Sequence, residues 1–119
     1  MTLEELIQAV KQGKAIQGEV FSGKDLSDQD FSHANFLNCD FSGANLRNSN
    51  LHHAKLRACN FSKADLRGAD LSQSDLCNAD MTDAKLRRAN LTNSNRIGTK
   101  IHKWALKGAY ITGSTAYVD

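Results

Sequence analysis

The chain carries a large apolar residue at every fifth position over more than half of its length. An α-helix repeats about every 3.6 residues and a strand every 2 residues, so neither fits a strict period of five. This period predicts short extended pieces joined by corners and stacked into a solenoid. The positions are Phe21, Leu26, Phe31, Phe36, Phe41, Leu46, Leu51, Leu56, Phe61, Leu66, Leu71, Leu76, Met81, Leu86 and Leu91.

The residues between the large ones repeat as well. A small residue such as Ala44 or Ala64 lies two places before most large ones, and an Asp or Asn such as Asp65 usually stands between the two. The next two places are mostly polar, as outward strand and turn positions require. The consensus A-[DN]-[LF]-x-x resembles the pentapeptide repeat family, and the resemblance covers about residues 19–118. It implies a right-handed quadrilateral β-helix with four pentads in each coil.

A second repeat of twenty residues supports the four-sided coil. Residues 39–47, 59–67 and 79–87 read CDFSGANLR, CNFSKADLR and ADMTDAKLR. We therefore expect an all-β solenoid, a right-handed quadrilateral β-helix of about five coils, whose columns are read by adding twenty. The interior columns are Phe21/Phe41/Phe61/Met81/Ile101, Leu26/Leu46/Leu66/Leu86/Leu106, Phe31/Leu51/Leu71/Leu91/Ile111 and Phe36/Leu56/Leu76/Arg96/Ala116.

The two ends of the solenoid are predicted to differ. Residues 2–12 form an amphipathic helix pattern with a capping box at Thr2 and Glu5, so residues 1–14 are expected to be a short capping α-helix. Residues 15–119 then form the β-helix, with an irregular last coil over 96–119. Arg96 breaks an apolar column there, and Trp104 falls where earlier coils have Ala. Either Trp104 turns outward or residues 99–107 form a helical turn with Ile101, Trp104 and Ala105 on one side; we favour a distorted coil.

Aromatic residues gather near this C-terminal end. Trp104, Tyr110 and Tyr117 are a candidate interface, because aromatic side chains are enriched at the centres of interfaces. The interface expected is an end-to-end homodimer, which would also hide open strand edges. The alternative is that the three rings only cap the last coil.

One outward column is basic. Arg47, Arg67, Arg87 and Lys107 follow one another at intervals of twenty, and Lys85 and Arg88 extend the strip. Asp65 lies on the same side as Arg67, whereas Lys85 is the equivalent neighbour of Arg87. The strip is a candidate surface for an anion or an acidic partner. The alternative is that the arginine stems only cover the coil and their heads meet nearby Asp or Asn.

Other reactive residues give weaker signals. His33 and His53 share an outward column beside His52, but no third ligand of fixed geometry is evident, so a solvated pair is expected rather than a metal site. Cys39 and Cys59 share an interior column at a spacing that a disulfide allows, yet buried thiols replacing Ala are favoured. No acid, base and nucleophile are brought together, so we expect no enzyme activity, no cofactor and no metal.

Composition adds limits on function. The chain has 119 residues and a formal net charge of +2, which fits one domain and argues against a general nucleic-acid binder. No membrane span or signal pattern is evident, so a cytoplasmic protein is expected. The leading hypothesis is an interaction module or scaffold that binds another protein of unknown identity.

Two alternatives use the surface differently. The resemblance implies DNA mimicry acting on DNA gyrase or another topoisomerase, but family members of that kind use an acidic surface, which the basic strip does not match. The second alternative is binding of nucleic acid or anionic lipid by the basic strip, and nucleic acid is the less expected partner.

Overall fold

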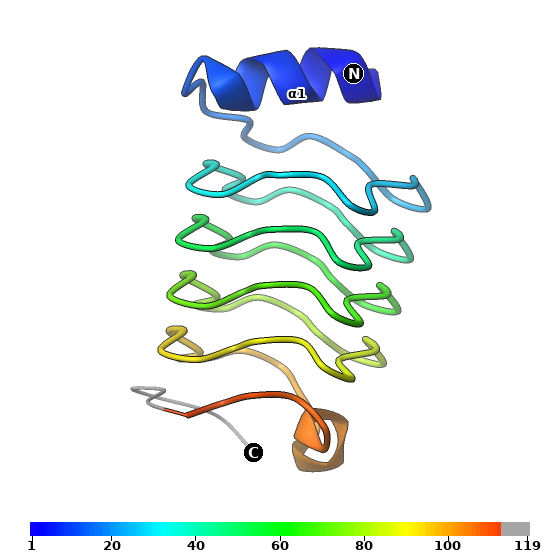
Figure 1. Ribbon diagram of the computed structural model, residues 1–119, viewed down its shortest axis with the longest axis vertical. Helices are drawn as coiled ribbons and strands as arrows, with labels where there is room; N and C mark the ends of the chain where they lie inside the picture. The colour runs from blue at the N-terminus through cyan, green and yellow to red at the C-terminus, as the bar shows by residue number, and fades with distance from the viewer. Residues whose placement is uncertain (113–119) are drawn as a thin grey trace.

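The computed structural model describes residues 1–112. It is a right-handed quadrilateral β-helix that stacks in coils of twenty residues beneath one short helix, as Figure 1 shows. The molecule measures 35 × 23 × 21 Å along its principal axes. The predicted fold class is therefore confirmed. The expected interior residue Ala116 and interface residue Tyr117 lie outside the described part of the chain.

Helix α1 spans Leu3–Lys11 and covers the N-terminal end of the solenoid. The Thr2 hydroxyl accepts a hydrogen bond from the Glu5 amide at 3.1 Å, and the Glu5 carboxylate accepts one from the Thr2 amide at 2.8 Å. This capping box satisfies two amides that the first helical turn leaves free. Leu6 on the lower face is fully buried, so the helix closes the first coil with an apolar stripe.

Each side of the solenoid is too short to form more than one bridging residue. Parallel bridges join residues twenty apart, beginning with Ala15 to Asn35 and continuing to Asp80 with Lys100. Each corner then requires a left-handed residue, such as Asn48 at φ 56° or Gly68 at φ 73°. Asn and Gly tolerate this conformation best, which explains part of the polar composition of the corners.

The Asp and Asn residues of the repeat stabilise these corners. The Asp65 carboxylate accepts a hydrogen bond from the amide of Arg67 at 3.2 Å, and Asn45 does the same for Arg47 at 3.1 Å. These contacts explain why the repeat has Asp or Asn in this column, because their side chains bond to the amide two residues further on.

The interior is formed by the predicted columns. The rings of Phe21, Phe41 and Phe61 stack, with centroids 5.3 and 5.1 Å apart. Ile16, which the sequence analysis did not include, is also buried and begins the fourth column. The other buried members are Leu26, Phe31, Phe36, Leu46, Leu51, Leu56, Leu66, Leu71, Leu76, Met81, Leu86, Leu91 and Ile101.

Buried thiols and hydroxyls in the small-residue columns bond to main-chain carbonyls. Cys39 Sγ donates to the carbonyl of Ile16 at 2.6 Å, and Cys59 Sγ donates to that of Phe36 at 2.9 Å. Both cysteines are free thiols, and burial raises the pKa of Cys39 to about 11 and that of Cys59 to about 12. The two residues therefore act as small interior residues with a satisfied donor.

The last coil departs from the preferred interpretation. Residues Lys103–Leu106 form a short 3-10 helix, η1, instead of a distorted extended side. Trp104 lies on it with 69% of its surface exposed, because the indole is too large for the inward position that Ala84 occupies one coil earlier. The alternative that Trp104 turns outward is confirmed, whereas the helical-turn alternative is right about the turn but wrong in placing Trp104 on the same side as the buried Ile101.

Two expected core residues are less buried than predicted. Leu106 is only half-buried and packs against the edge of the core, and Ile111 is 41% exposed. The physical reason is the interrupted ladder, in which no bridge joins Lys85 to Ala105 within residues 1–112, although Asn90 bridges to Tyr110. Side chains of the last coil therefore have a full coil on their N-terminal side, whereas among residues 1–112 no further coil covers their other side.

Arg96 lies inside the solenoid, with only 2% of its surface exposed. Its Nε and Nη1 atoms are buried and have no hydrogen-bond partner within the described residues. Burial lowers the pKa of the guanidinium, since charge is poorly stabilised there. Arg96 thus marks the place where the apolar column ends.

Candidate interaction face

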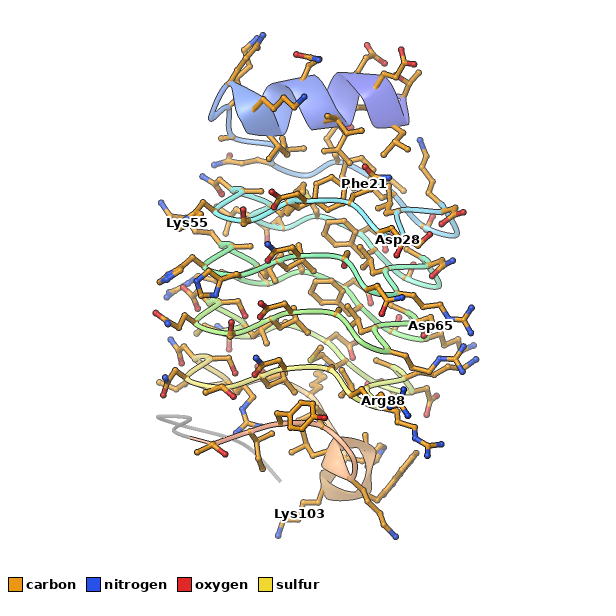
Figure 2. The ribbon with its side chains drawn as sticks, in the orientation of Figure 1. Phe21, Asp28, Lys55, Asp65, Arg88 and Lys103 are labelled. Carbon is orange, nitrogen blue, oxygen red and sulfur yellow. The ribbon has the colours of Figure 1, made fainter. Side chains whose placement is uncertain are left out.

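The basic strip lies on one side of the solenoid. In Figure 2, Asp28, Asp65 and Arg88 follow one another down one side of the view, and Lys55 lies on the opposite side. Each cation of the main column, Arg47, Arg67, Arg87 and Lys107, directly follows an inward Leu, so successive side chains project outward at the coil spacing of about 4.8 Å. The coil register therefore sets the position of every charge on this side.

The paired half of this face consists of Arg47, Arg67 and Asp65. Asp65 Oδ2 lies 3.0 Å from Arg47 Nε and 2.7 Å from Arg67 Nη2, and Arg67 Nε donates to Asp65 Oδ1 at 2.8 Å. The hydrogen bond from Arg67, aided by the charges of Arg67 and Arg47, holds the pKa of Asp65 below its usual value. One carboxylate thus forms ion pairs with two guanidinium groups.

The open half consists of Lys85, Arg87, Arg88 and Lys107. Lys85 occupies the bridge position next to Asp65, one coil further along. Within residues 1–112 no carboxylate lies within salt-bridge distance of any of these four cations. Replacement of Asp by Lys at one column position therefore removes the carboxylate that offsets the arginines and adds a further positive charge.

Two shallow hollows run along the face. The first, of about 460 Å³, is lined by Arg47, Asn48, Arg67, Gly68, Arg87 and Arg88. Gly68 helps to open it, because a Cβ at this position would collide with the side-chain oxygen of Asn48. The second, of about 390 Å³, is lined by Arg67, Asp83, Ala84, Lys85, Leu86, Arg87, Trp104, Ala105 and Lys107.

The second hollow joins two features that the sequence analysis treated separately. Trp104 from the aromatic end lines it together with Lys85, Arg87 and Lys107 from the basic strip. The imidazole of His102 stacks on the indole, with centroids 5.6 Å apart and planes 13° apart. The repeat of twenty residues could have predicted that Trp104 lies near Lys85, because Trp104 and Ala105 follow Ala84 and Lys85 by twenty residues.

Tyr110 does not join this group. It is 59% exposed, but it lies on the next side of the coil, where it bridges to Asn90. The structure therefore separates it from Trp104 instead of forming one aromatic patch from both.

The histidines form a cluster on that same next side. The His33 and His53 rings stack with centroids 5.0 Å apart, and the His52 ring meets the His53 ring edge-on at 4.1 Å. Slight desolvation, followed by the charges of His52 and His33, lowers the pKa of His53. Across residues 1–112 no group of three or more His, Cys, Asp or Glu residues has the arrangement of a metal site.

The fold and the repeat define a solenoid repeat protein. A family model described as pentapeptide repeats (8 copies) matches residues 25–62 and 59–95, which together make up more than half of the chain. The chain belongs to the pentapeptide repeat family.

No helix of residues 1–112 has the length and apolar character needed to cross a membrane.

Solved structures of several relatives share the fold. A pentapeptide repeat protein from the thylakoid lumen of Arabidopsis thaliana is 28% identical with a TM-score of 0.72, over 92% of this chain and 86% of that protein. One from Nostoc is 27% identical with a TM-score of 0.70, over 92% and 95% of the two chains. HetL, a Nostoc protein involved in the regulation of heterocyst differentiation, is 28% identical with a TM-score of 0.67, over 96% of this chain and 48% of HetL. No curated protein sequence matches this chain significantly.

Proposed function

We propose that this protein is a non-enzymatic interaction module that binds an acidic segment of another protein through the open half of its basic face. The observation that carries the proposal is the set of four cations, Lys85, Arg87, Arg88 and Lys107, that line the hollows without a carboxylate partner in the described part of the chain.

Like charges at the coil spacing disfavour the folded state unless something offsets them. Two unit charges about 5 Å apart repel by about 1 kcal/mol even in water. The paired half shows the arrangement that removes this repulsion, because Asp65 contacts both of its arginines. Among residues 1–112 the open half has no such group, so a partner's carboxylates would gain attraction without displacing one from that part of the chain.

The geometry also supports binding rather than catalysis. The main-chain ladder positions this side of the solenoid up to the bridge between Asp65 and Lys85. The hollows are lined mostly by cations and small residues together with Trp104, with Asp83 as the acid among them. The Asp and Asn side chains of the repeat are occupied by turn hydrogen bonds, such as Asp65 with the Arg67 amide. A general acid and a general base are not placed around one hollow.

The test is binding of a fluorescein-labelled decaglutamate peptide, followed by fluorescence anisotropy. The double variant Arg87→Glu with Lys107→Glu should weaken binding about tenfold or more, because two attractions become repulsions. The matched control is Lys55→Glu with Lys63→Glu, which makes the same change of net charge at exposed positions on other sides. Equal weakening by both variants would show that only net charge matters and would overturn the proposal.

An end-to-end homodimer is a less favourable use of the C-terminal end. Trp104 and Tyr110 are exposed there, but residues 84–112 contain seven Lys and Arg residues and no Asp or Glu. A two-fold contact would bring the same cations of two copies together. We therefore expect a monomeric mass in light scattering at high protein concentration.

Action on DNA gyrase by DNA mimicry is also less favourable, since a duplex mimic needs an acidic surface and this face is basic. A supercoiling assay at micromolar protein should show no effect.

We include a cytoplasmic location of the protein in the proposed function.

A further inference from the structure

The hollow around Trp104 offers more than positive charge. Lys85, Arg87 and Lys107 line it together with Ala105 and Trp104. Its volume of about 390 Å³ is within the range of pockets that hold a small group. A chain of glutamates would use the cations and leave the apolar part of the hollow in contact with water.

The indole of Trp104 already stacks on another ring of this chain. Trp104 lies on η1, and the stack with His102 covers one face of the ring. A ring has two faces, and within residues 1–112 no other aromatic ring contacts the indole. Trp104 is 69% exposed, so much of the indole surface is available for a second ring to pack on.

The charges around the hollow limit the kind of partner peptide that can supply this second ring. Asp83 is the acid that lines the hollow, against the cations Arg67, Lys85, Arg87 and Lys107. A ring within a neutral peptide would gain only a cation–π contact from these cations, whereas acidic residues on either side of the ring would add ion pairs with them.

We propose that this hollow takes the aromatic side chain of the acidic segment, so that the preferred partner carries an aromatic residue flanked by Asp or Glu. This inference rests on the proposed function and names the feature of the partner that the Trp104 hollow selects. The flanking carboxylates meet Lys85, Arg87 and Lys107, and the aromatic ring packs against Trp104 and Ala105.

The test compares two seven-residue peptides, EDEFEDE and EDEAEDE, which have equal charge and differ only in the central ring. The Phe peptide should bind three- to tenfold more tightly, which corresponds to the usual gain from an aromatic pair. Trp104 is the only tryptophan of the chain, so its fluorescence reports directly on the hollow. Its emission should shift to shorter wavelength with the Phe peptide and remain nearly unchanged with the Ala peptide.

Two variants locate the effect. Trp104→Ala should abolish the preference for the Phe peptide while the Ala peptide keeps its affinity. Tyr110→Ala, which removes an exposed ring outside the hollow, should leave the preference intact. Circular dichroism melting of both variants checks that the solenoid is folded.

The outcomes separate the two proposals. Equal binding of both peptides without a fluorescence shift would overturn the Trp104 inference and leave the acidic-segment function standing. Binding of neither peptide would overturn both. Trp104-dependent binding of a thymidine oligonucleotide that is tighter than binding of the Phe peptide would assign the hollow to single-stranded nucleic acid instead, since such sites also combine stacking with cations.

Discussion

The two halves of the basic face are formed by the same columns and the same main chain, yet only one of them has a carboxylate paired with its cations. In the paired half, Asp65 contacts both Arg47 and Arg67. In the open half, Lys85 takes the equivalent place beside Arg87, and the described residues supply no carboxylate. A single column position thus decides whether a row of arginines stabilises the coil or remains free for a partner.

The comparison shows how this solenoid separates folding from binding. Main-chain hydrogen bonds and inward Leu residues hold the coils whatever the outward residue is, as the bridge between Asp65 and Lys85 demonstrates. Outward columns are therefore free to change sign without a change of fold. The halves differ in one further respect, because the ladder is complete under the paired half and interrupted by η1 next to the open half.

The largest expected effect concerns the core beneath the two halves. Leu66 and Leu106 belong to one interior column, but Leu66 is fully buried and Leu106 is only half-buried. Leu66→Ala should lower the free energy of unfolding by about 3 kcal/mol, because it leaves a cavity inside a complete ladder. Leu106→Ala should lower it by about 1 kcal/mol. Urea unfolding measures both, and equal losses would show that the last coil is as tightly packed as the others.

The next prediction converts the open half into a paired half. Lys85→Asp places a carboxylate beside Arg87 as Asp65 stands beside Arg67, and the chain itself shows that Asp fits this column. The acidic peptide should bind about tenfold more weakly, since one attraction is lost and Arg87 gains an internal partner. Unchanged anisotropy titration curves would mean that the open half is not the binding surface.

The reverse change should free the paired half. Asp65→Asn keeps the turn hydrogen bond, as Asn45 does one coil earlier, but removes the charge that holds Arg47 and Arg67. The acidic peptide should bind about threefold more tightly by the same titration. A loss of affinity would indicate that Asp65 positions the arginines for the partner instead of occupying them.

The smallest effect is the pH dependence of the Asp65 ion pairs. The folded-state pKa of Asp65 lies below its unfolded value, so its stabilising contribution is present above about pH 4 and is lost as the pH falls through the folded pKa. The wild type should therefore melt at a slightly higher temperature than Asp65→Asn at pH 6, by less than about 3 °C, and the difference should shrink at pH 2.5. A difference that grows on acidification would have the wrong sign for this account.

Much of the fold was predictable because one rule applies at every coil. The period of five and the period of twenty placed Leu66 and its column correctly, since each position has the same neighbours above and below. The rule failed in the last coil, where positions within the described residues no longer have the same neighbours on both sides. Ile111 is exposed and Lys103–Leu106 turn into η1, because Trp104 cannot enter the alanine position and the ladder is interrupted between Lys85 and Ala105.

The candidate site was predictable in part for the same reason. The columns placed the basic residues on one side and identified Asp65 as a neighbour of Arg67. They did not show that Asp65 also reaches Arg47 in the coil before, because an arginine side chain is long enough to cross the coil spacing in either direction. The register places Trp104 one coil after Ala84 and next to the column of Lys85, but the helical turn that exposes its indole is not encoded by the repeat.

The most direct test of the central claim is the map of amide chemical shifts when the acidic peptide is added to the wild-type protein in heteronuclear NMR. The account predicts that the largest changes occur at residues 85–88 and 103–108, with smaller ones at 47–48 and 67–68. Changes confined to the opposite side around Lys55 and Arg57, or spread evenly over all four sides, would contradict it.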